Sequence, residues 1–272
     1  MVRCGMRMTT VTPGVRRAID ALTSTIGAWS ETEAIALVLT GEDVYDPYFF
    51  LSLDVYTRGP VRSADLRERE FGDVVAFEHS ALAHKDRFLI GDMPVRIEYK
   101  AVDRFEQLAD AAEHGRSGIR DEGTYAFHRV VEADTLYART GWFENLRERL
   151  GKLPDAFWAG LRSSFQAVAE HTYADLSAAA VRDDALYFAL SAGRFLSALF
   201  SLLFAANRMF EPSPRSVSEL LCDLDVPDSF PANLENFVSP SQLSLGQRSE
   251  LAEMMVTGVI SMYGGSDQAQ IT

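Results

Sequence analysis

The sequence predicts an α+β protein in which a small domain with a mixed β-sheet and flanking helices precedes an all-helical bundle. Three observations predict this class. Short β-rich runs alternate with polar helical segments up to about residue 120 of the 272-residue chain. From about residue 121, one apolar helical pattern follows another, separated by turn signals such as "EPSPRS". No internal repeat or low-complexity linker is present. We therefore expect two domains, residues 1–120 and 121–272.

The elements of the first half follow from their patterns, in order. "PGVRRAIDALTSTIGAW" (13–29) carries apolar residues on one helical face and a Pro at its start, which predicts a helix. Strands are predicted at 34–40, 48–57 and 73–78, with a short helix from "RSADLRERE" before the third. "RFLI" and "VRIEYK" predict a hairpin across "GDMP", and the next helix, 103–115, ends at Gly115.

The second half is expected to be helical throughout. Helices are predicted at 124–139, 142–150, 155–180, 184–210, 215–223 and 247–263. The most apolar run is "ALYFALSAGRFLSALFSLLFAAN" (185–207), which contains Arg194 and is followed by Arg208. The charges in and around it favour a buried central helix over a membrane span.

Composition and charge exclude several function classes. A hydrophobic content of 47% and a charged content of 24% are typical of a soluble globular protein. The net charge of −13 argues against a long nucleic-acid partner, although a small nucleotide accompanied by Mg²⁺ remains compatible with it. Cys4 and Cys222 form no metal-binding pattern, and no apolar core of signal-peptide length follows the start. These features predict a cytoplasmic protein with no membrane partner.

Two predicted strands each place a carboxylate in an otherwise apolar run: Asp54 in "LSLDVYT" and Glu98 in "VRIEYK". Because side chains alternate along a strand, Ser52 and Asp54 share one side, as do Glu98 and Lys100. If the strands are neighbours, the two carboxylates approach each other across the sheet. Paired ionised carboxylates repel unless a cation or a proton holds them, which suggests a metal or acid–base site. The alternative is that each carboxylate faces solvent or pairs with a nearby Arg.

The order of elements in this part of the chain resembles the nucleotidyltransferase fold of the aminoglycoside-modifying and polymerase-beta-like superfamily. That order is an apolar strand, a Gly, a loop and a second strand that carries an acid. Here the matching residues are Gly41-Glu42, the loop 43–51, and Ser52-Leu53-Asp54, with Glu98 at the place of the third acid. The helix end "LFAANRMFEPSPRS" also resembles "LNRxYxP" helix ends of related uncharacterised families. The resemblance covers most of the chain.

The resemblance implies a chemistry. In that family, acids on alternate strand positions bind Mg²⁺ ions that hold a nucleoside triphosphate, a later acid binds metal or accepts a proton, and the Gly lets the backbone approach the phosphates. Asp54 and Glu98 would be the metal ligands and catalytic residues, and Gly41 would line the phosphates. Two residues depart from the pattern: Glu42 replaces a small hydroxyl residue, and Ser52 replaces the first Asp. Glu42, Asp43 or Asp46 could supply a substitute ligand from the loop.

Two functions therefore stand as hypotheses. The first is a transferase that moves a nucleoside monophosphate from a Mg²⁺–nucleoside triphosphate to a hydroxyl of a small-molecule acceptor. The second is a catalytically inactive member of the fold that binds a ligand or a protein, with a homodimer left open. Glu42 and Ser52 belong to the expected binding site, together with Arg58, Arg96 and Lys100, which could bind phosphate or pair with surface charges.

Overall fold

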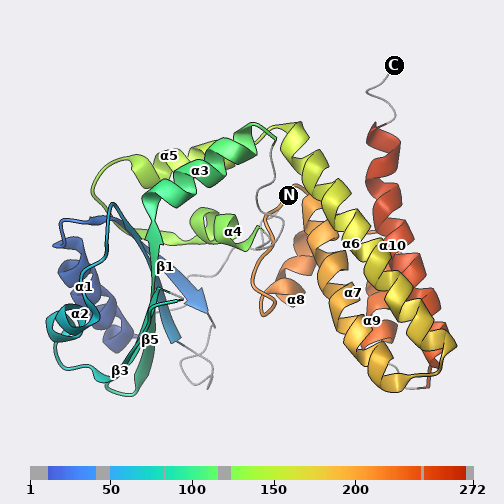
Figure 1. Cartoon of the computed structure of the whole chain (residues 1–272), viewed down its shortest axis with the longest axis horizontal. Helices are drawn as coiled ribbons and strands as arrows, with labels where there is room; N and C mark the ends of the chain where they lie inside the picture. Colours follow the sequence, from blue (N-terminus) through green and yellow to red (C-terminus); the bar gives the residue numbers. More distant parts are fainter. Residues whose placement is uncertain (1–11, 41–49, 83, 116–123, 240–241, 268–272) are drawn as a thin grey trace. The chain divides into compact units, whose positions relative to one another are not determined.

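The computed structural model describes residues 12–40, 50–82, 84–115, 124–239 and 242–267 (Figure 1). The chain divides into two compact units. The first comprises residues up to Ala111 together with Arg129–Lys152, and the second comprises Ala112–His128 together with residues from Leu153 onward. One unit contains a β-sheet and the other is helical, which confirms the predicted α+β class.

The first unit is built on a six-stranded mixed sheet with the order β3-β4-β5-β2-β1-β6. Its strands are β1 (Thr32–Thr40), β2 (Phe50–Thr57), β3 (Val75–Ser80), β4 (Lys85–Ile90), β5 (Met93–Ala101) and β6 (Asp134–Ala138). β2 and β5 pair in parallel, whereas the other neighbouring strands are antiparallel. The parallel pair stands at the centre of the sheet and carries both acids singled out from the sequence.

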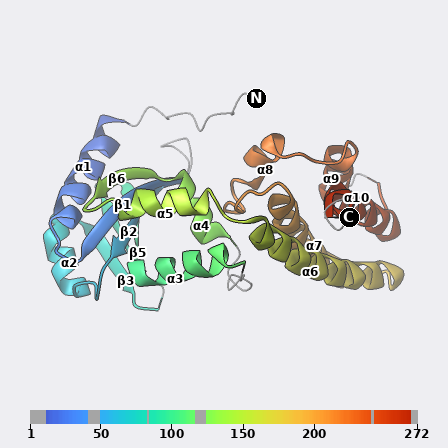
Figure 2. The same cartoon turned by 90° about the horizontal axis from the view of Figure 1, so that it is seen from above.

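One face of the sheet is covered by α1 (Pro13–Gly27) and α2 (Ala64–Phe71), as Figure 2 shows. The apolar side of α1 packs against the side chains of β2 that alternate away from Asp54. The buried cluster includes Ile19, Leu22, Leu51, Leu53 and Val55. The predicted alternation of β2 is therefore confirmed, and it leaves Ser52 and Asp54 on the opposite face.

The opposite face is covered by α3 (Val102–Glu113), α5 (Trp142–Leu150) and the end of α4 (Tyr125–Glu132). Tyr56 of β2 is fully buried there, with ring centroids 4.9 Å from Phe143, 5.2 Å from Phe105 and 5.5 Å from Trp142. This aromatic cluster fixes the helices against the same face that carries Asp54. The acid therefore lies between a sheet and helices, in a region of low dielectric.

A second buried acid, Asp86 of β4, lies on the α1–α2 face. Arg67 of α2 donates to both of its carboxylate oxygens at 2.7 Å, and the Tyr99 hydroxyl donates at 2.8 Å. The His79 Nδ1 atom lies 2.9 Å from the same carboxylate. This network ties α2 to the sheet and leaves Asp86 with complete hydrogen bonding, as a buried carboxylate requires.

The second unit is a helical bundle formed by α6 (Asp155–Val181), α7 (Ala185–Ala206), α8 (Val217–Leu220), a 3₁₀ turn (Leu221–Asp223), α9 (Phe230–Val238) and α10 (Leu245–Asp267). α6 and α7 lie side by side, with α10 packed on both (Figures 1 and 2). In the part of the chain that the structure describes, α7 is the one helix long and apolar enough to cross a membrane, and 56% of its most apolar window is buried. Its side chains enter the bundle core, as predicted, with Phe188, Phe195, Leu199 and Phe204 at 1% exposure or less.

Three sequence predictions differ from the structure. The helix predicted over 124–139 ends at Glu132, because 134–138 form β6 and pair with the edge of β1. α9 was missed because its first residues read as part of the turn "DVPDSFP". The units also do not divide at residue 120: β6 and α5 return the chain to the sheet unit, so Arg129–Lys152 belong with the first unit.

Candidate functional site: a buried acid held by cations

The parallel register of β2 and β5 brings the two predicted acids side by side. Asp54 lies opposite Glu98, Ser52 opposite Arg96, and Tyr56 opposite Lys100. The pairing was predicted on the condition that the strands are neighbours, and the register confirms that condition. Because both carboxylates extend from the same face of adjacent strands, a cation or a proton has to offset their repulsion. The structure supplies this charge from the protein itself.

Asp54 is fully buried, and both of its carboxylate oxygens are engaged by cationic side chains. Lys100 Nζ donates to Oδ2 at 2.6 Å, and Arg129 Nε donates to the same oxygen at 2.8 Å. Arg129 Nη2 donates to Oδ1, which completes a bidentate ion pair. Burial opposes ionisation of Asp54, but the charges of Lys100 and Arg129 outweigh it and lower the pKa of the carboxyl below its ordinary value. Asp54 is thus an anion neutralised on both oxygens.

Arg129 is the central cation of the site. It extends from the part of α4 that belongs to the sheet unit, and its side chain is 3% exposed. Besides Asp54, Arg129 Nη2 donates to Ser52 Oγ at 3.4 Å, and Nη1 lies 3.7 Å from Glu98 Oε1. One guanidinium therefore contacts every residue that the sequence resemblance placed at the acid positions of this sheet.

Glu98 lies closer to solvent than Asp54, with its side chain 14% exposed. Its Oε1 atom lies 3.3 Å from Lys85 Nζ and 3.4 Å from Arg96 Nε. Lys85 faces Glu98 directly across the β4–β5 pair, and Arg96 precedes it by two positions on the same face of β5. The second acid is therefore also surrounded by cationic side chains.

Ser52 stands where the resembling family has an acid, and its environment explains the hydroxyl. It is fully buried and accepts hydrogen bonds from Arg96 Nη2 at 3.2 Å and from Arg129 Nη2 at 3.4 Å. A hydroxyl satisfies these donors without adding charge. Ser52 thus accepts from the guanidinium groups that hold Asp54 and Glu98 in place.

The residues present do not fit a Mg²⁺ ion. Magnesium takes octahedral oxygen coordination at short range, and both oxygens of Asp54 already accept from Lys100 and Arg129. Within the described ranges, no group of three or more His, Cys, Asp and Glu side chains could hold a metal. The positions of the expected metal are taken by ammonium and guanidinium groups, so we derive no metal-dependent step from this arrangement.

The predicted site residues separate into three groups. Ser52, Asp54, Glu98 and Lys100 meet on the sheet. Arg58 instead pairs with Glu33 at 2.7 Å and is 52% exposed, which is the charge-pairing alternative that the sequence left open. Gly41 and Glu42, with Asp43 and Asp46 of the loop, lie outside the described residues.

Sequence reasoning missed Arg129 and Lys85. One feature of the sequence could have indicated Arg129: it lies in "YAFHRVVEA", between apolar residues that continue one face of a helix. An Arg on such a face needs a buried acid as its partner. Lys85 lies two residues before "RFLI", the run predicted as a strand. β4 begins at Lys85 instead, and this longer strand places Lys85 opposite Glu98.

Comparisons with known proteins add the following findings. A family model described as a domain of unknown function, DUF4037, matches residues 122–215, a stretch that begins just before α4 and includes Arg129. A solved structure titled as a nucleotidyltransferase-like protein from Exiguobacterium sibiricum matches at 17% sequence identity and a TM-score of 0.49. The alignment covers 92% of this chain and 76% of that one. No curated protein matches.

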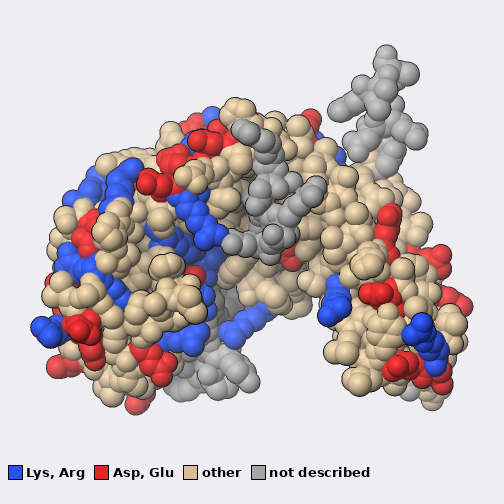
Figure 3. Space-filling view, in the orientation of Figure 1, with Lys and Arg blue, Asp and Glu red and all other residues tan. Residues whose placement is uncertain are grey.

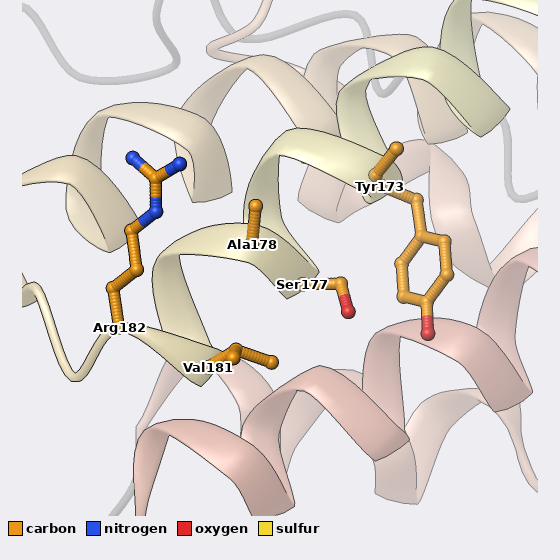
Figure 4. A pocket seen from close by; sticks show the side chains of 6 residues that line it. Tyr173, Ser177, Ala178, Val181 and Arg182 are labelled. Atoms are coloured by element: carbon orange, nitrogen blue, oxygen red, sulfur yellow. The ribbon is translucent and has the colours of Figure 1, made fainter.

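A separate pocket lies on the helical unit, along α6 (Figure 4). It has a volume of about 590 Å³ and is lined by Tyr173, Ala174, Ser177, Ala178, Val181 and Arg182. Figure 4 shows Tyr173, Ser177 and Val181 pointing toward the neighbouring helix, whereas Arg182 extends the other way. The lining is mainly apolar and brings no pair of acids together. The sheet face therefore remains the candidate site.

Proposed function

We propose that this chain is a protein of nucleotidyltransferase-like architecture that binds a ligand at the Asp54–Glu98 face without a divalent metal and does not transfer nucleotides. The observation that carries the proposal is the bidentate pairing of Asp54 with Arg129, completed by Lys100. An acid pair needs a positive charge to hold it together. Here protein side chains supply that charge and occupy both oxygens of Asp54, which a metal would need.

The alternative candidate is a transferase that moves a nucleoside monophosphate from a Mg²⁺–nucleoside triphosphate to an acceptor hydroxyl. The observation that favours it is the direct adjacency of Asp54 and Glu98 across β2 and β5. The energy needed to separate Asp54 from Arg129 counts against the transferase, because breaking a buried ion pair costs about 3–5 kcal/mol when one partner is left uncompensated. Metal binding would have to supply that energy before any chemistry.

Calorimetry and turnover assays with ATP, GTP, CTP and UTP in the presence of Mg²⁺ test the two candidates. The proposal expects neither metal-dependent binding nor release of pyrophosphate with any of the four. Turnover that is lost in Asp54→Asn would overturn it and establish the transferase.

A restoration experiment gives a sharper comparison. The variant Ser52→Asp with Glu42→Ser returns the sequence to the pattern of the resembling family. We expect no Mg²⁺ binding from this change, because the new acid would accept from Arg96 and Arg129, as Ser52 does now. If this variant gains Mg²⁺-dependent nucleotide binding, the cations on the sheet do not block the metal, and the proposal is wrong.

A further inference from the structure

The face that carries Asp54 and Glu98 has an excess of positive charge. Five cationic residues belong to it: Lys85 and Arg87 of β4, Arg96 and Lys100 of β5, and Arg129 of α4. Among the residues of these strands and of α4 that the structure describes, we count three acids on it: Asp54, Glu98, and Glu78 of β3, which faces Arg87. Within that described set, five positive charges stand against three negative ones. Glu42, Asp43 and Asp46 lie outside the described residues and are not counted. The chain as a whole carries −13, so this face stands out from the rest of the molecule.

Two arginines oppose each other directly on this face. Arg87 and Arg96 are register partners on the antiparallel pair β4–β5, a geometry in which like charges destabilise a sheet. Arg96 contacts Ser52 and Glu98, whereas the exposed Arg87 has no ion pair among the residues that the structure describes. An anion placed between the two guanidinium groups would relieve their repulsion.

The buried part of the face holds Asp54 between Lys100 and Arg129, and Arg129 Nη1 also lies 3.7 Å from Glu98 Oε1. Burial lowers the pKa of Lys100, and the charge of Arg129 lowers it further, while Asp54 acts in the opposite direction. Lys100 is 13% exposed, Arg96 20% and Lys85 30%, so these side chains remain within reach of a ligand. Figure 3 shows Lys and Arg atoms around the strands and α4 on the visible face of this unit.

We propose that this face binds the phosphate group of a small molecule between Arg87 and Arg96, with no divalent cation. The proposal rests on the proposed function, since it needs the protein's own cations to remain on the sheet. Guanidinium groups match phosphate oxygens with two parallel hydrogen bonds, so the opposed guanidinium groups of Arg87 and Arg96 suit a phosphate group. The overall charge of −13 restricts the ligand to a small molecule, because a nucleic-acid strand would be repelled by the rest of the surface.

Titration calorimetry of the full chain in excess EDTA tests the proposal, with inorganic phosphate and adenosine monophosphate as separate probes. We expect saturable binding of phosphate that weakens as salt is raised. Comparable binding of both probes identifies free phosphate as the ligand, and tighter binding of adenosine monophosphate identifies a phosphomonoester. Either result supports recognition of the phosphate group.

Two variants and a matched control locate the binding. Arg87→Gln removes an exposed cation that forms no ion pair with any residue in the described ranges, so it should fold normally and weaken binding about three- to tenfold. Arg96→Gln should weaken binding by more than about tenfold. Arg16→Gln is the control, because this exposed arginine lies on α1, which covers the opposite face of the sheet, and it should bind as the native chain does.

Three results would overturn the proposal. The first is no binding of either probe, and the second is equal binding by Arg87→Gln and Arg16→Gln. The third is binding that appears only after Mg²⁺ replaces EDTA, and this result would also overturn the proposed function. If the chain binds neither phosphate nor a metal, only the assignment of phosphate as the ligand is wrong, and the proposed metal-free function stands. The failure of the one proposal can therefore be told apart from the failure of the other.

Discussion

The ion pair between Asp54 and Arg129 leads to a measurable stability prediction. Asp54 is 0% exposed and Arg129 3%, so Asp54→Asn leaves the buried cations Arg129 and Lys100 without their acid, whereas Arg129→Gln leaves Asp54 paired with Lys100 alone. Asp54→Asn should therefore cost about 3–5 kcal/mol in the stability of the sheet unit, and Arg129→Gln should cost less than Asp54→Asn. Because the two groups act on each other, the double variant should cost less than the sum by at least about 1.5 kcal/mol.

Hydrogen exchange read by mass spectrometry on peptides from β2 and β5 is the suitable assay, because it reports the sheet unit separately from the helical unit. A loss of 3–5 kcal/mol corresponds to exchange that is roughly 10²- to 4 × 10³-fold faster in these strands. Lys152→Gln is the control: it removes a cation whose side chain is 72% exposed, and it should leave exchange in β2 unchanged. Single variants that cost under about 1 kcal/mol, or a double variant that costs the full sum, would refute the view that this pair holds the site together.

Three further predictions follow from other contacts. Glu31 accepts a hydrogen bond from Arg62, which lowers the pKa of Glu31 to about 2, so Glu31→Gln should cost about 1–2 kcal/mol of stability at neutral pH. The stability difference between the native chain and the variant should fade as the pH falls from about 4.5 toward 2. A difference in urea midpoint that does not change with pH would contradict the ion pair. Asp86→Asn should cost about 3–5 kcal/mol because it leaves Arg67 buried without its acid, and a thermal midpoint equal to that of the native chain would show that Arg67 finds another partner. Gly115→Ala should cost about 1–2 kcal/mol in urea unfolding, because Gly115 has a φ of +67° and an added Cβ would lie 3.2 Å from the Cβ of Ala156. Unchanged stability would mean that the end of α3 relaxes to accommodate the methyl group.

Much of the sheet unit could be predicted from local pattern. Alternation in "LSLDVYT" and "VRIEYK" placed Asp54 and Glu98 each on one face of a strand, and the turn "GDMP" placed the β4–β5 hairpin. These features depend on residues two to four apart, which a sequence displays directly. Their pairing in parallel, by contrast, depends on strands more than forty residues apart and could only be stated as a condition.

The chemical character of the site could not be predicted, because it depends on Arg129. That residue lies 75 positions beyond Asp54 in a helix that was expected to continue to residue 139. β6 was missed because "DTLYA" is short and directly follows an apolar helical face, so local propensity gave no boundary. Tertiary pairing with the edge of β1 decides its structure. It also returns α4 to the sheet and thereby brings Arg129 to Asp54.

The most direct test of the central claim is a crystal structure of the full chain soaked with Mn²⁺ and a non-hydrolysable nucleoside triphosphate, with anomalous data collected for manganese. Our account predicts no anomalous peak between Asp54 and Glu98, and it predicts that Lys100 and Arg129 remain hydrogen-bonded to Asp54 as they are now. A manganese peak coordinated by both carboxylates, with the two cations displaced, would contradict it and establish a metal-dependent nucleotidyltransferase site.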